Sequence, residues 1–289
     1  MRSGRGSAPA RAALAGNPSD GYGGRVLAVA LGELRAEAEA APAPVDDVDG
    51  ELARAALTRF RRRFPELALA PVRIRWRTAV PREVGLGGSS AIVIAVLRAL
   101  LDAHGESLAP GELARIALAA ETEELGIAAG LQDRLVQVHE GLLCMDFGAG
   151  EVAVEALDPG LLPPLYVAWH PEAASPSGAI HTELRTREEA VRPAMAELAA
   201  LAARARDALR TNDHEAFAAG VDGSLAIRAR IMPVHPRVSR MAQLARAAGA
   251  SANSAGSSGA IVGTVGGGTW PELEHALATE GCGVLLPRA

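Results

Sequence analysis

The sequence contains no lysine, since all 29 of its basic side chains are arginine in a chain of 289 residues. This absence excludes a Schiff-base lysine and a phosphate-binding loop of the kind that ends in Gly-Lys-Ser/Thr. Any phosphate that the chain binds must therefore contact backbone amides, arginine, serine or a metal ion. Aromatic residues are also scarce, at 3%, so a core must be built mainly from alanine, leucine and valine.

Cysteine, long apolar runs and excess basic charge are lacking as well. Cys144 and Cys282 are far apart among apolar neighbours, which indicates free thiols and a reducing, cytoplasmic setting. No run of about 18 uncharged apolar residues occurs, so we expect no membrane span. Residues 1–9 lack the apolar segment of a signal peptide and are expected to be a disordered leader. The net charge of −5 argues against nucleic-acid binding, and the arginine run at residues 59–63 is expected to be a solvated helix face.

The pattern of apolar residues predicts an α+β protein in two halves. A proline-rich turn at residues 158–164 is the best boundary, so we expect domains at residues 10–160 and 161–289. Residues 36–49, with two prolines and several acids, are expected to form a poorly structured connection. The second half alternates short strands with long helices, which indicates an antiparallel α+β unit.

The glycine- and serine-rich stretch at residues 81–91 leads directly into an apolar helix. Free backbone N–H groups at a helix N-terminus, together with the helix dipole, form a natural phosphate site. A serine-hydrolase elbow needs Gly-x-Ser-x-Gly, and here Ala91 stands at the last position. The segment predicts a protein that handles a nucleotide or a sugar phosphate, with a ligand-free strand-to-helix turn as the alternative.

A second segment places acids at the end of one expected helix and an aspartate at the start of the next. Glu121, Glu123 and Glu124 precede a glycine-bearing loop, and Asp133 follows it. Such a segment can converge on one site, where a carboxylate helps to hold Mg²⁺ and an aspartate orients or deprotonates a hydroxyl. Solvated helix faces for the glutamates and helix capping for Asp133 are the alternatives.

Together these segments resemble the GHMP small-molecule kinases. Residues 81–91 are similar to their second motif, Pro-x-x-x-Gly-Leu-Gly-Ser-Ser-Ala, with Gly88 in place of one serine. Residues 10–20 are similar to the first motif, and residues 121–133 to the catalytic segment. Within this superfamily the chain most resembles the glucuronokinases known from plants, with which it shares longer runs of residues. Residues 177–181 match them more loosely.

The resemblance implies a fold and a reaction. The expected fold has an N-terminal domain like ribosomal protein S5 domain 2 and a C-terminal ferredoxin-like α/β sandwich. The implied reaction converts ATP and D-glucuronate to ADP and glucuronate 1-phosphate, with Mg²⁺ as cofactor and no nucleic-acid or membrane partner. For assembly we expect a monomer or weak homodimer.

The resemblance also assigns roles. Asp133 matches the catalytic aspartate beside the acceptor hydroxyl, Arg11 a basic residue paired with it, and Ser90 and Glu121 the Mg²⁺ ligands. The residues assigned to ATP are Pro81, Gly85, Leu86, Gly87, Gly88, Ser89, Ser90 and Ala91. The candidates for the sugar are Asp20, Tyr22, Gly23, Arg134, Arg185, Gly256 and Ser257. Arg134 and Arg185 are included because a uronic acid carries a carboxylate, for which arginine is the natural partner.

Two departures from the family pattern affect these expectations. In the third, C-terminal motif at residues 253–260, Ala255 stands where threonine is usual and Ser258 where glycine is usual. The chain is also shorter than the plant enzymes around residues 35–70, near the expected adenine pocket, so the resemblance says less about nucleotide preference than about the kinase reaction. Three hypotheses stay open: a glucuronate 1-kinase, a kinase for galacturonate or a neutral aldose such as galactose, and a non-catalytic sugar- or nucleotide-binding protein.

Overall fold

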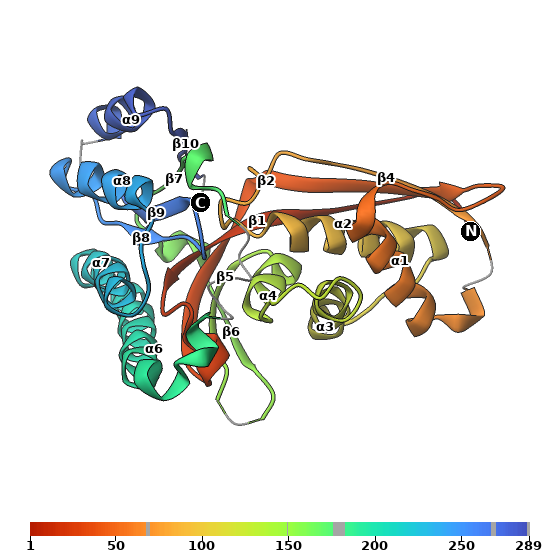
Figure 1. The fold of residues 1–289 in the computed structure, drawn as a ribbon, viewed down its shortest axis with the longest axis horizontal. Coiled ribbons are helices and arrows are strands. Elements are labelled where there is room, and N and C mark those ends of the chain that lie inside the picture. Colours follow the sequence, from red (N-terminus) through yellow and green to blue (C-terminus); the bar gives the residue numbers. More distant parts are fainter. Residues whose placement is uncertain (68–69, 149, 176–182, 267–269, 288–289) are drawn as a thin grey trace. The chain divides into compact units, whose positions relative to one another are not determined.

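The chain forms two compact units (Figure 1). The computed structural model describes the chain except residues 68–69, 149, 176–182, 267–269 and 288–289. Unit 1 comprises Met1–Ala10, Ala30–Pro81 and Gly87–Glu140. Unit 2 comprises Arg11–Val29, Arg82–Leu86 and Gly141–Ala289. The expected boundary near residue 160 therefore does not describe the units. The long strands β1 (Gly4–Ala15) and β2 (Arg25–Pro42) each contribute to both.

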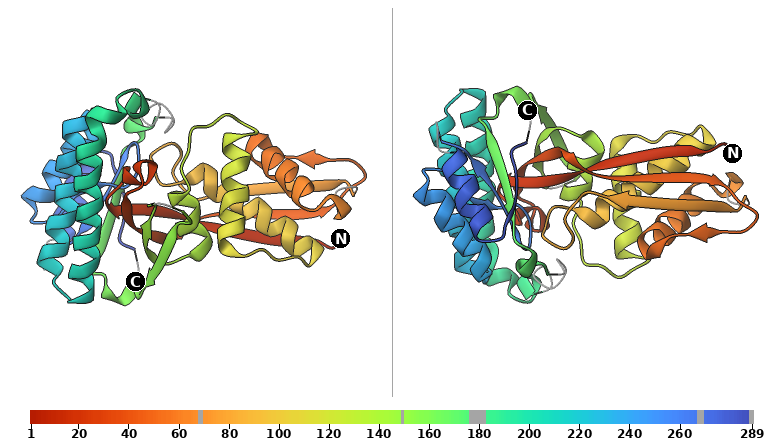
Figure 2. Two further views of the ribbon diagram at one scale, coloured as in Figure 1. Left: turned by 90° about the horizontal axis from the view of Figure 1, so that it is seen from below. Right: turned by 90° about the horizontal axis from the view of Figure 1, so that it is seen from above.

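Unit 1 is a layer of strands covered by helices. Strand β4 (Val72–Thr78) pairs antiparallel with β2, from Ala36 opposite Thr78 to Pro42 opposite Val72, and β3 (Asp47–Val48) pairs parallel with β4. The helices are α1 (Gly50–Arg63), α2 (Gly88–His104), α3 (Pro110–Thr122) and α4 (Gln132–His139), with a short 3-10 turn at Pro65–Leu67. They lie on one face of these strands (Figure 1 and Figure 2).

Strand β1 starts at Gly4, within the segment expected to be a disordered leader. Two glycines explain the difference, because they let the strand approach α2 closely. A Cβ added at Gly4 would lie 2.3 Å from the backbone nitrogen of Ala103, and one at Gly6 would lie 2.2 Å from the carbonyl oxygen of Ala95. The absence of side chains, which suggested disorder, is what permits this packing.

Strand β2 continues through residues 36–42, which were expected to be poorly structured. Ala36, Ala38 and Ala40 are buried, whereas Glu37 and Glu39 are exposed. This is the alternation of a half-buried strand, written with alanine in place of larger apolar residues. The low strand propensity of alanine and glutamate concealed it.

Unit 2 contains two groups of strands. The start of β2 pairs antiparallel with β5 (Leu142–Asp146), which pairs antiparallel with β6 (Ala153–Leu157). A separate four-stranded sheet has the order β10-β7-β9-β8. Its strands are β7 (Leu165–Trp169), β8 (Asn253–Ser254), β9 (Ala260–Thr264) and β10 (Gly283–Leu285).

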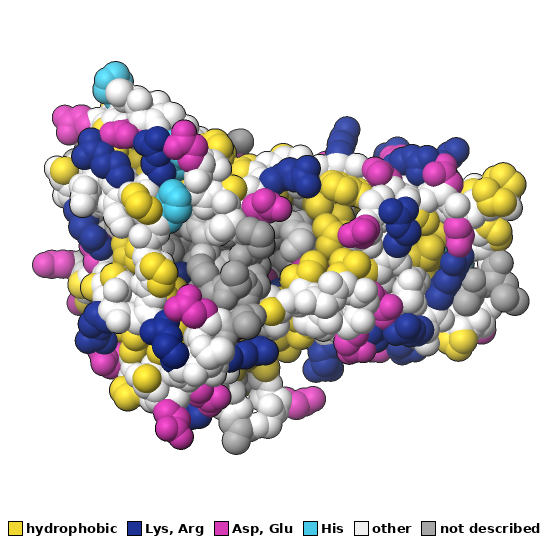
Figure 3. Space-filling model, in the orientation of Figure 1, with side chains coloured by type: hydrophobic (Ala, Val, Ile, Leu, Met, Phe, Trp, Pro, Cys, Tyr) yellow, Lys and Arg dark blue, Asp and Glu magenta, His cyan; other side chains and the backbone are white. Residues whose placement is uncertain are grey.

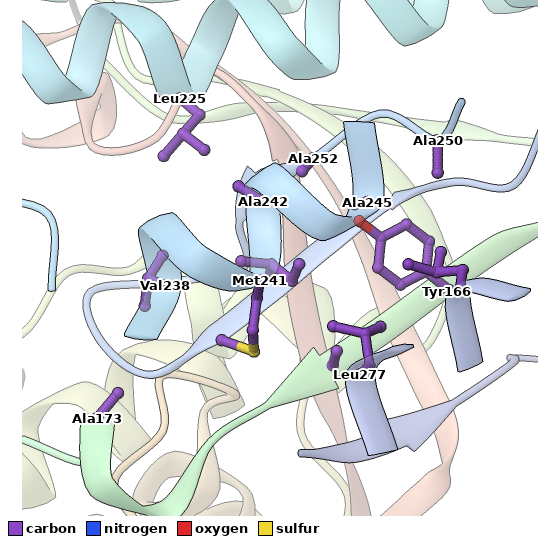
Figure 4. Close-up of a cluster of buried hydrophobic side chains, with 13 residues drawn as sticks. Tyr166, Ala173, Leu225, Val238, Met241, Ala242, Ala245, Ala250, Ala252 and Leu277 are labelled. Carbon is purple, nitrogen blue, oxygen red and sulfur yellow. The ribbon is translucent and has the colours of Figure 1, made fainter. Parts of the chain in front are cut away.

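The long helices of unit 2 are α6 (Glu188–Arg210) and α7 (His214–Ile231), which pack against each other (Figure 2). Helices α8 (Pro236–Ala247) and α9 (Trp270–Thr279) follow, with 3-10 turns at Ser19–Tyr22, Pro159–Leu161 and Pro171–Ala173. One core of this unit joins Tyr166 of β7 to Leu225, Met241 and Leu277 of the helices (Figure 4). Alanines fill the gaps between these larger side chains, as the scarcity of aromatic residues predicts.

Charges of both signs are interspersed on the surface (Figure 3). The arginine run at residues 59–63 pairs with acids: Arg59 with Glu123 and Glu124, Arg61 with Asp46, Arg62 with Glu124 and Arg63 with Glu112. Arg62 and Arg63 thus lie on the expected solvated face of α1, whereas the Arg59 side chain is only 15% exposed. Among the described helices, none combines the length and the apolar character needed to span a bilayer.

Candidate active site

In unit 1 the glycine-rich stretch ends at the N-terminus of α2. Gly87 precedes the helix in the left-handed conformation, with φ of 75°, and its carbonyl accepts the first helical hydrogen bond from the Ala91 N–H at 3.0 Å. The same carbonyl accepts hydrogen bonds from Gln137 Nε2 at 2.7 Å and from Ser90 Oγ at 3.1 Å. The first N–H groups of α2 have no partner within the helix, which is the arrangement that can bind an anion at a helix N-terminus.

Three helices of unit 1 contribute to one buried network. Ser89 Oγ, at the start of α2, donates to Glu121 Oε1 at 2.7 Å. Glu121, at the end of α3, is fully buried, and its other oxygen accepts from Arg134 Nε at 3.0 Å and also from Nη2. Arg134, in the first turn of α4, also donates from Nη1 to Gly130 O at 2.8 Å. Of the three acids singled out in the sequence, Glu121 thus meets the start of α4, whereas Glu123 and Glu124 pair with Arg59 and Arg62 of α1.

The structure pairs Glu121 with Ser89 rather than with Ser90, the serine matched to the metal from the sequence. Ser90 is 1% exposed and its hydroxyl donates within the first turn to Gly87 O, whereas Ser89 is exposed. The reason is the helical rotation of about 100° per residue, which turns adjacent side chains to different faces. The hydroxyl available beside the carboxylate is therefore one residue earlier than expected.

Arg134 also differs from expectation. Its side chain is 4% exposed and its guanidinium is committed to Glu121 and Gly130, so it is not presented to a sugar carboxylate. Asp133 lies next to it, with Oδ2 4.0 Å from Arg134 Nη1 and its side chain 21% exposed. The aspartate thus remains partly accessible while its neighbour braces the buried glutamate.

In unit 2, two glycine-bearing loops lie against each other. A Cβ at Gly256 would lie 2.1 Å from Gly85 O, and a Cβ at Gly85, whose φ is +83°, would lie 2.9 Å from the backbone nitrogen of Ser258. Ser258 Oγ donates to Glu83 O at 2.8 Å. The serine that departs from the family pattern therefore ties the third-motif loop to residues 82–86, and glycine is required at both points of contact.

Arg11 connects these two loops. Its backbone N–H donates to Leu86 O at 3.0 Å, and its Nη1 donates to Gly85 O at 2.6 Å and to Ala255 O at 3.0 Å. The residue is 5% exposed. A buried cation is thus fixed between the segment at residues 82–86 and the third-motif loop.

The sugar candidates of the first motif lie on the 3-10 turn at Ser19–Tyr22. Asp20 is half-buried in its first turn, and Gly23 ends it in the left-handed conformation with φ of 75°. Tyr22 packs against α6, and burial, followed by the charge of Glu188, raises the pKa of its hydroxyl. Within the described part of the chain this buried hydroxyl has no hydrogen-bond partner. Arg185 is exposed, and residues 177–181 lie outside the described residues.

One buried cation of unit 2 was not expected from the sequence. Arg228 of α7 is 4% exposed, and it donates from Nη1 to Asn17 O at 3.1 Å and from Nη2 to Gly256 O at 2.8 Å. It thus joins the first- and third-motif loops. A signal was present, because Phe217, Val221 and Leu225 define the buried stripe of α7 and residue 228 continues it at helical spacing.

Comparison with known proteins identifies the family. A model of the GHMP kinase N-terminal domain matches residues 51–141. Glucuronokinase 1 of Arabidopsis thaliana is 33% identical over 266 residues, which cover 77% of this chain and 73% of that protein. The chain belongs to the GHMP kinases. Probable glucuronokinase 2 of the same plant is 34% identical over 250 residues, or 71% of this chain and 68% of that protein.

Solved GHMP kinases share the fold. The galactokinase of Lactococcus lactis, complexed with galactose, superposes with a TM-score of 0.83 at 13% identity, over 99% of this chain and 93% of that one. The expectation of a two-domain α+β fold is confirmed. The family membership makes this protein an ATP-dependent small-molecule kinase.

Proposed function

We propose that this GHMP kinase transfers the γ-phosphate of ATP to the anomeric hydroxyl of D-glucuronate, giving ADP and glucuronate 1-phosphate. A sugar acceptor is favoured by the two glucuronokinase relatives. The observation that carries the phosphotransfer part is the network at the start of α2, where Ser89, Glu121 and Arg134 are bonded in sequence next to Asp133. Hard oxygen donors, helix amides and an accessible aspartate are what phosphoryl transfer to an alcohol needs.

The residues present fit Mg²⁺ bound together with a nucleotide. Mg²⁺ in phosphotransferases is held by one or two protein oxygen ligands plus phosphate oxygens, and Ser89 Oγ and Glu121 Oε1 supply such a pair 2.7 Å apart. No group of three His, Cys, Asp or Glu side chains suited to a metal occurs among the described residues. When bound, the metal would neutralise phosphate charge.

The chain's own groups would do the rest. The first N–H groups of α2, with residues 85–91 around them, would bind the phosphates without lysine. Asp133 would accept a hydrogen bond from the anomeric hydroxyl and orient its oxygen toward the γ-phosphorus. As the new O–P bond forms and the bond to the ADP oxygen breaks, the hydroxyl proton passes to the aspartate or to solvent. Arg11 would contribute positive charge near the acceptor.

The sugar would be bound by the first- and third-motif loops of unit 2. Asp20 supplies a carboxylate acceptor, Tyr22 a buried hydroxyl, and Gly256 and Ser257 a close backbone approach. A cytoplasmic location, favoured by the free thiols of Cys144 and Cys282, and a monomer or weak homodimer belong to the same proposal. Light scattering of the purified chain tests the assembly.

A transfer assay with ATP and Mg²⁺ tests the function. Glucuronate, galacturonate, galactose and glucose are offered singly, and the position of the phosphate on the undigested product is mapped by ³¹P NMR. Turnover of glucuronate to a 1-phosphate supports the proposal. Turnover of galactose or galacturonate in its place refutes the acceptor, and ATP binding without turnover of any sugar refutes catalysis.

A further inference from the structure

Unit 2 contains a pocket of about 320 Å³ beside the third-motif loop. Its polar lining consists of Arg228, His235, Ser175, Ser254, Ser257 and Ser258. Met232 and Val238 supply part of its apolar wall. The volume lies at the lower end of small-molecule sites, which suits a monosaccharide. Hydroxyl-rich walls with one cation would suit a polyol that carries one negative charge.

The cation of this pocket is held by neutral groups. The two hydrogen bonds of the Arg228 guanidinium go to the carbonyls of Asn17 and Gly256, and no salt bridge of the described residues includes it. A buried guanidinium normally has an anionic partner, because carbonyls alone offset only part of its lost hydration. Among the described residues the pocket cation therefore has no salt-bridge partner, and its charge is only partly offset.

The surroundings of Arg228 increase this imbalance. Burial, followed by the charge of Arg11, lowers the pKa of Arg228 from its ordinary value to about 10, and Asp20 acts in the opposite direction. The guanidinium still carries its charge at neutral pH. An anion placed in the pocket would offset both the burial and the repulsion from Arg11.

Other arginines offered for this role are less suitable. Arg134 already pairs with the buried Glu121, and Arg185 is exposed. Arg230, on the same helix as Arg228, forms a surface pair with Glu197. Arg228 alone of these four is both buried and part of the pocket wall.

We propose that Arg228 binds the anionic substituent of the acceptor sugar, the carboxylate of a uronic acid, in this pocket. The proposal rests on the proposed function and deepens it by naming the residue that separates uronates from neutral aldoses. The planar guanidinium would donate two parallel hydrogen bonds to the carboxylate, and Ser257 would donate to a ring hydroxyl. The phosphate of a sugar phosphate has the same acceptor chemistry, so the test must separate the two anions.

The test compares four full-length proteins: wild type, Arg228→Gln, Arg228→Lys and Arg230→Gln as the matched control on the same helix. Rates with ATP and Mg²⁺ are measured for D-glucuronate, D-glucose and D-glucose 6-phosphate. Glucuronate binding is measured by calorimetry, which does not require turnover. We expect Arg228→Gln to weaken glucuronate binding roughly 30- to 100-fold, the loss typical of a charge-assisted pair. The kcat/KM for glucose should fall at least about tenfold less than the kcat/KM for glucuronate.

Arg228→Lys should give an intermediate glucuronate KM, because lysine keeps part of the charge and loses the planar two-donor geometry. Arg230→Gln should match the wild type. Equal losses for glucuronate and glucose in Arg228→Gln would overturn the proposal, since a merely structural role moves both. If Arg228→Gln does not fold, Arg228→Lys decides: an unchanged ratio of glucuronate to glucose efficiency would overturn it.

The wild-type arm separates this proposal from the proposed function. A wild type that prefers glucose 6-phosphate, with the preference lost in Arg228→Gln, would refute the glucuronate acceptor and support an anion subsite at Arg228. A wild type that uses glucuronate, with Arg228→Gln keeping the preference, would refute the subsite alone. A wild type that prefers glucose over both anions would refute both.

Discussion

Replacing Arg134 by methionine is the sharpest test of the buried network in unit 1. The substitution keeps the length of the side chain and removes its charge. Arg134 is 4% exposed and Glu121 is fully buried, so water would replace only part of the lost interaction. The Glu121 carboxylate would then keep only the hydrogen bond from Ser89, which is too little for a buried charge.

The size of the effect follows from that burial. Breaking a buried ion pair by removing one partner costs about 3–5 kcal/mol. Unfolding entropies near 2.1 cal/mol/K per residue, over 289 residues, give about 0.6 kcal/mol per degree. Arg134→Met should therefore lower Tm by about 5–8 °C if the chain unfolds in one step. Arg115→Met, an exposed arginine on α3, is the control and should stay within about 0.5 kcal/mol of wild type.

Magnesium provides the second arm of this assay. In Arg134→Met the carboxylate of Glu121 has no counter-cation, so Mg²⁺ with a non-hydrolysable ATP analogue should raise Tm more than in the wild type. The double variant Glu121→Gln/Arg134→Met removes the charge as well as its partner. It should recover most of the lost stability and lose the extra response to Mg²⁺. An Arg134→Met protein within about 1 kcal/mol of wild type by denaturant unfolding would refute the reasoning from burial.

Three further changes test other parts of the structure. Asp133→Ala should lower kcat by about 10²–10⁴-fold and leave the calorimetric Kd for an ATP analogue nearly unchanged; retained turnover would remove Asp133 from the reaction. Burial works to raise the pKa of Glu140, but hydrogen bonds from Arg35 and Arg98 outweigh it and leave the pKa lowered. The stabilisation is present above the ordinary pKa of glutamate and is lost as the pH falls through the lowered pKa of Glu140. The free energy of unfolding of Glu140→Gln should therefore fall less at acidic pH than that of the wild type, and identical pH dependence of the two proteins would contradict this. Gly256→Ala would place a Cβ 2.1 Å from a carbonyl oxygen and should lower Tm and raise the sugar KM, and wild-type values for both would refute the loop contact.

Short-range sequence features predicted the helix ends of unit 1 that carry the candidate site. Glycines before α2, Pro110 at the start of α3 and Asp133 in the first turn of α4 mark these helix ends by their own backbone preferences. The convergence of Glu121 and the start of α4 follows from a short connection between helices. Which of two adjacent serines faces the carboxylate depends on where α2 begins, and one residue of uncertainty there changes the answer.

Contacts between distant segments could not be predicted in this way. Arg228 and Asn17 are 211 positions apart, and Gln137 bonds to Pro9 across 128. A polar side chain on the apolar stripe of a helix shows only that it needs a partner, because the partner comes from the tertiary fold. The strand at residues 36–42 was missed for another reason. Its alternation is carried by alanine, whose burial in a sheet depends on what packs above it.

The absence of lysine acquires a physical meaning from these buried sites. The surroundings of Arg228 bring its pKa down to about 10. A lysine there would start from an ordinary pKa of about 10.4, well below that of arginine. Burial and a neighbouring cation would then lower the pKa of the lysine amine further, so that part of it would be deprotonated at physiological pH. Arginine keeps its charge, and the five N–H donors of its planar guanidinium can bind two carbonyls and a carboxylate at the same time. The bias toward arginine thus allows a cation to remain charged in a pocket where lysine would be partly neutral.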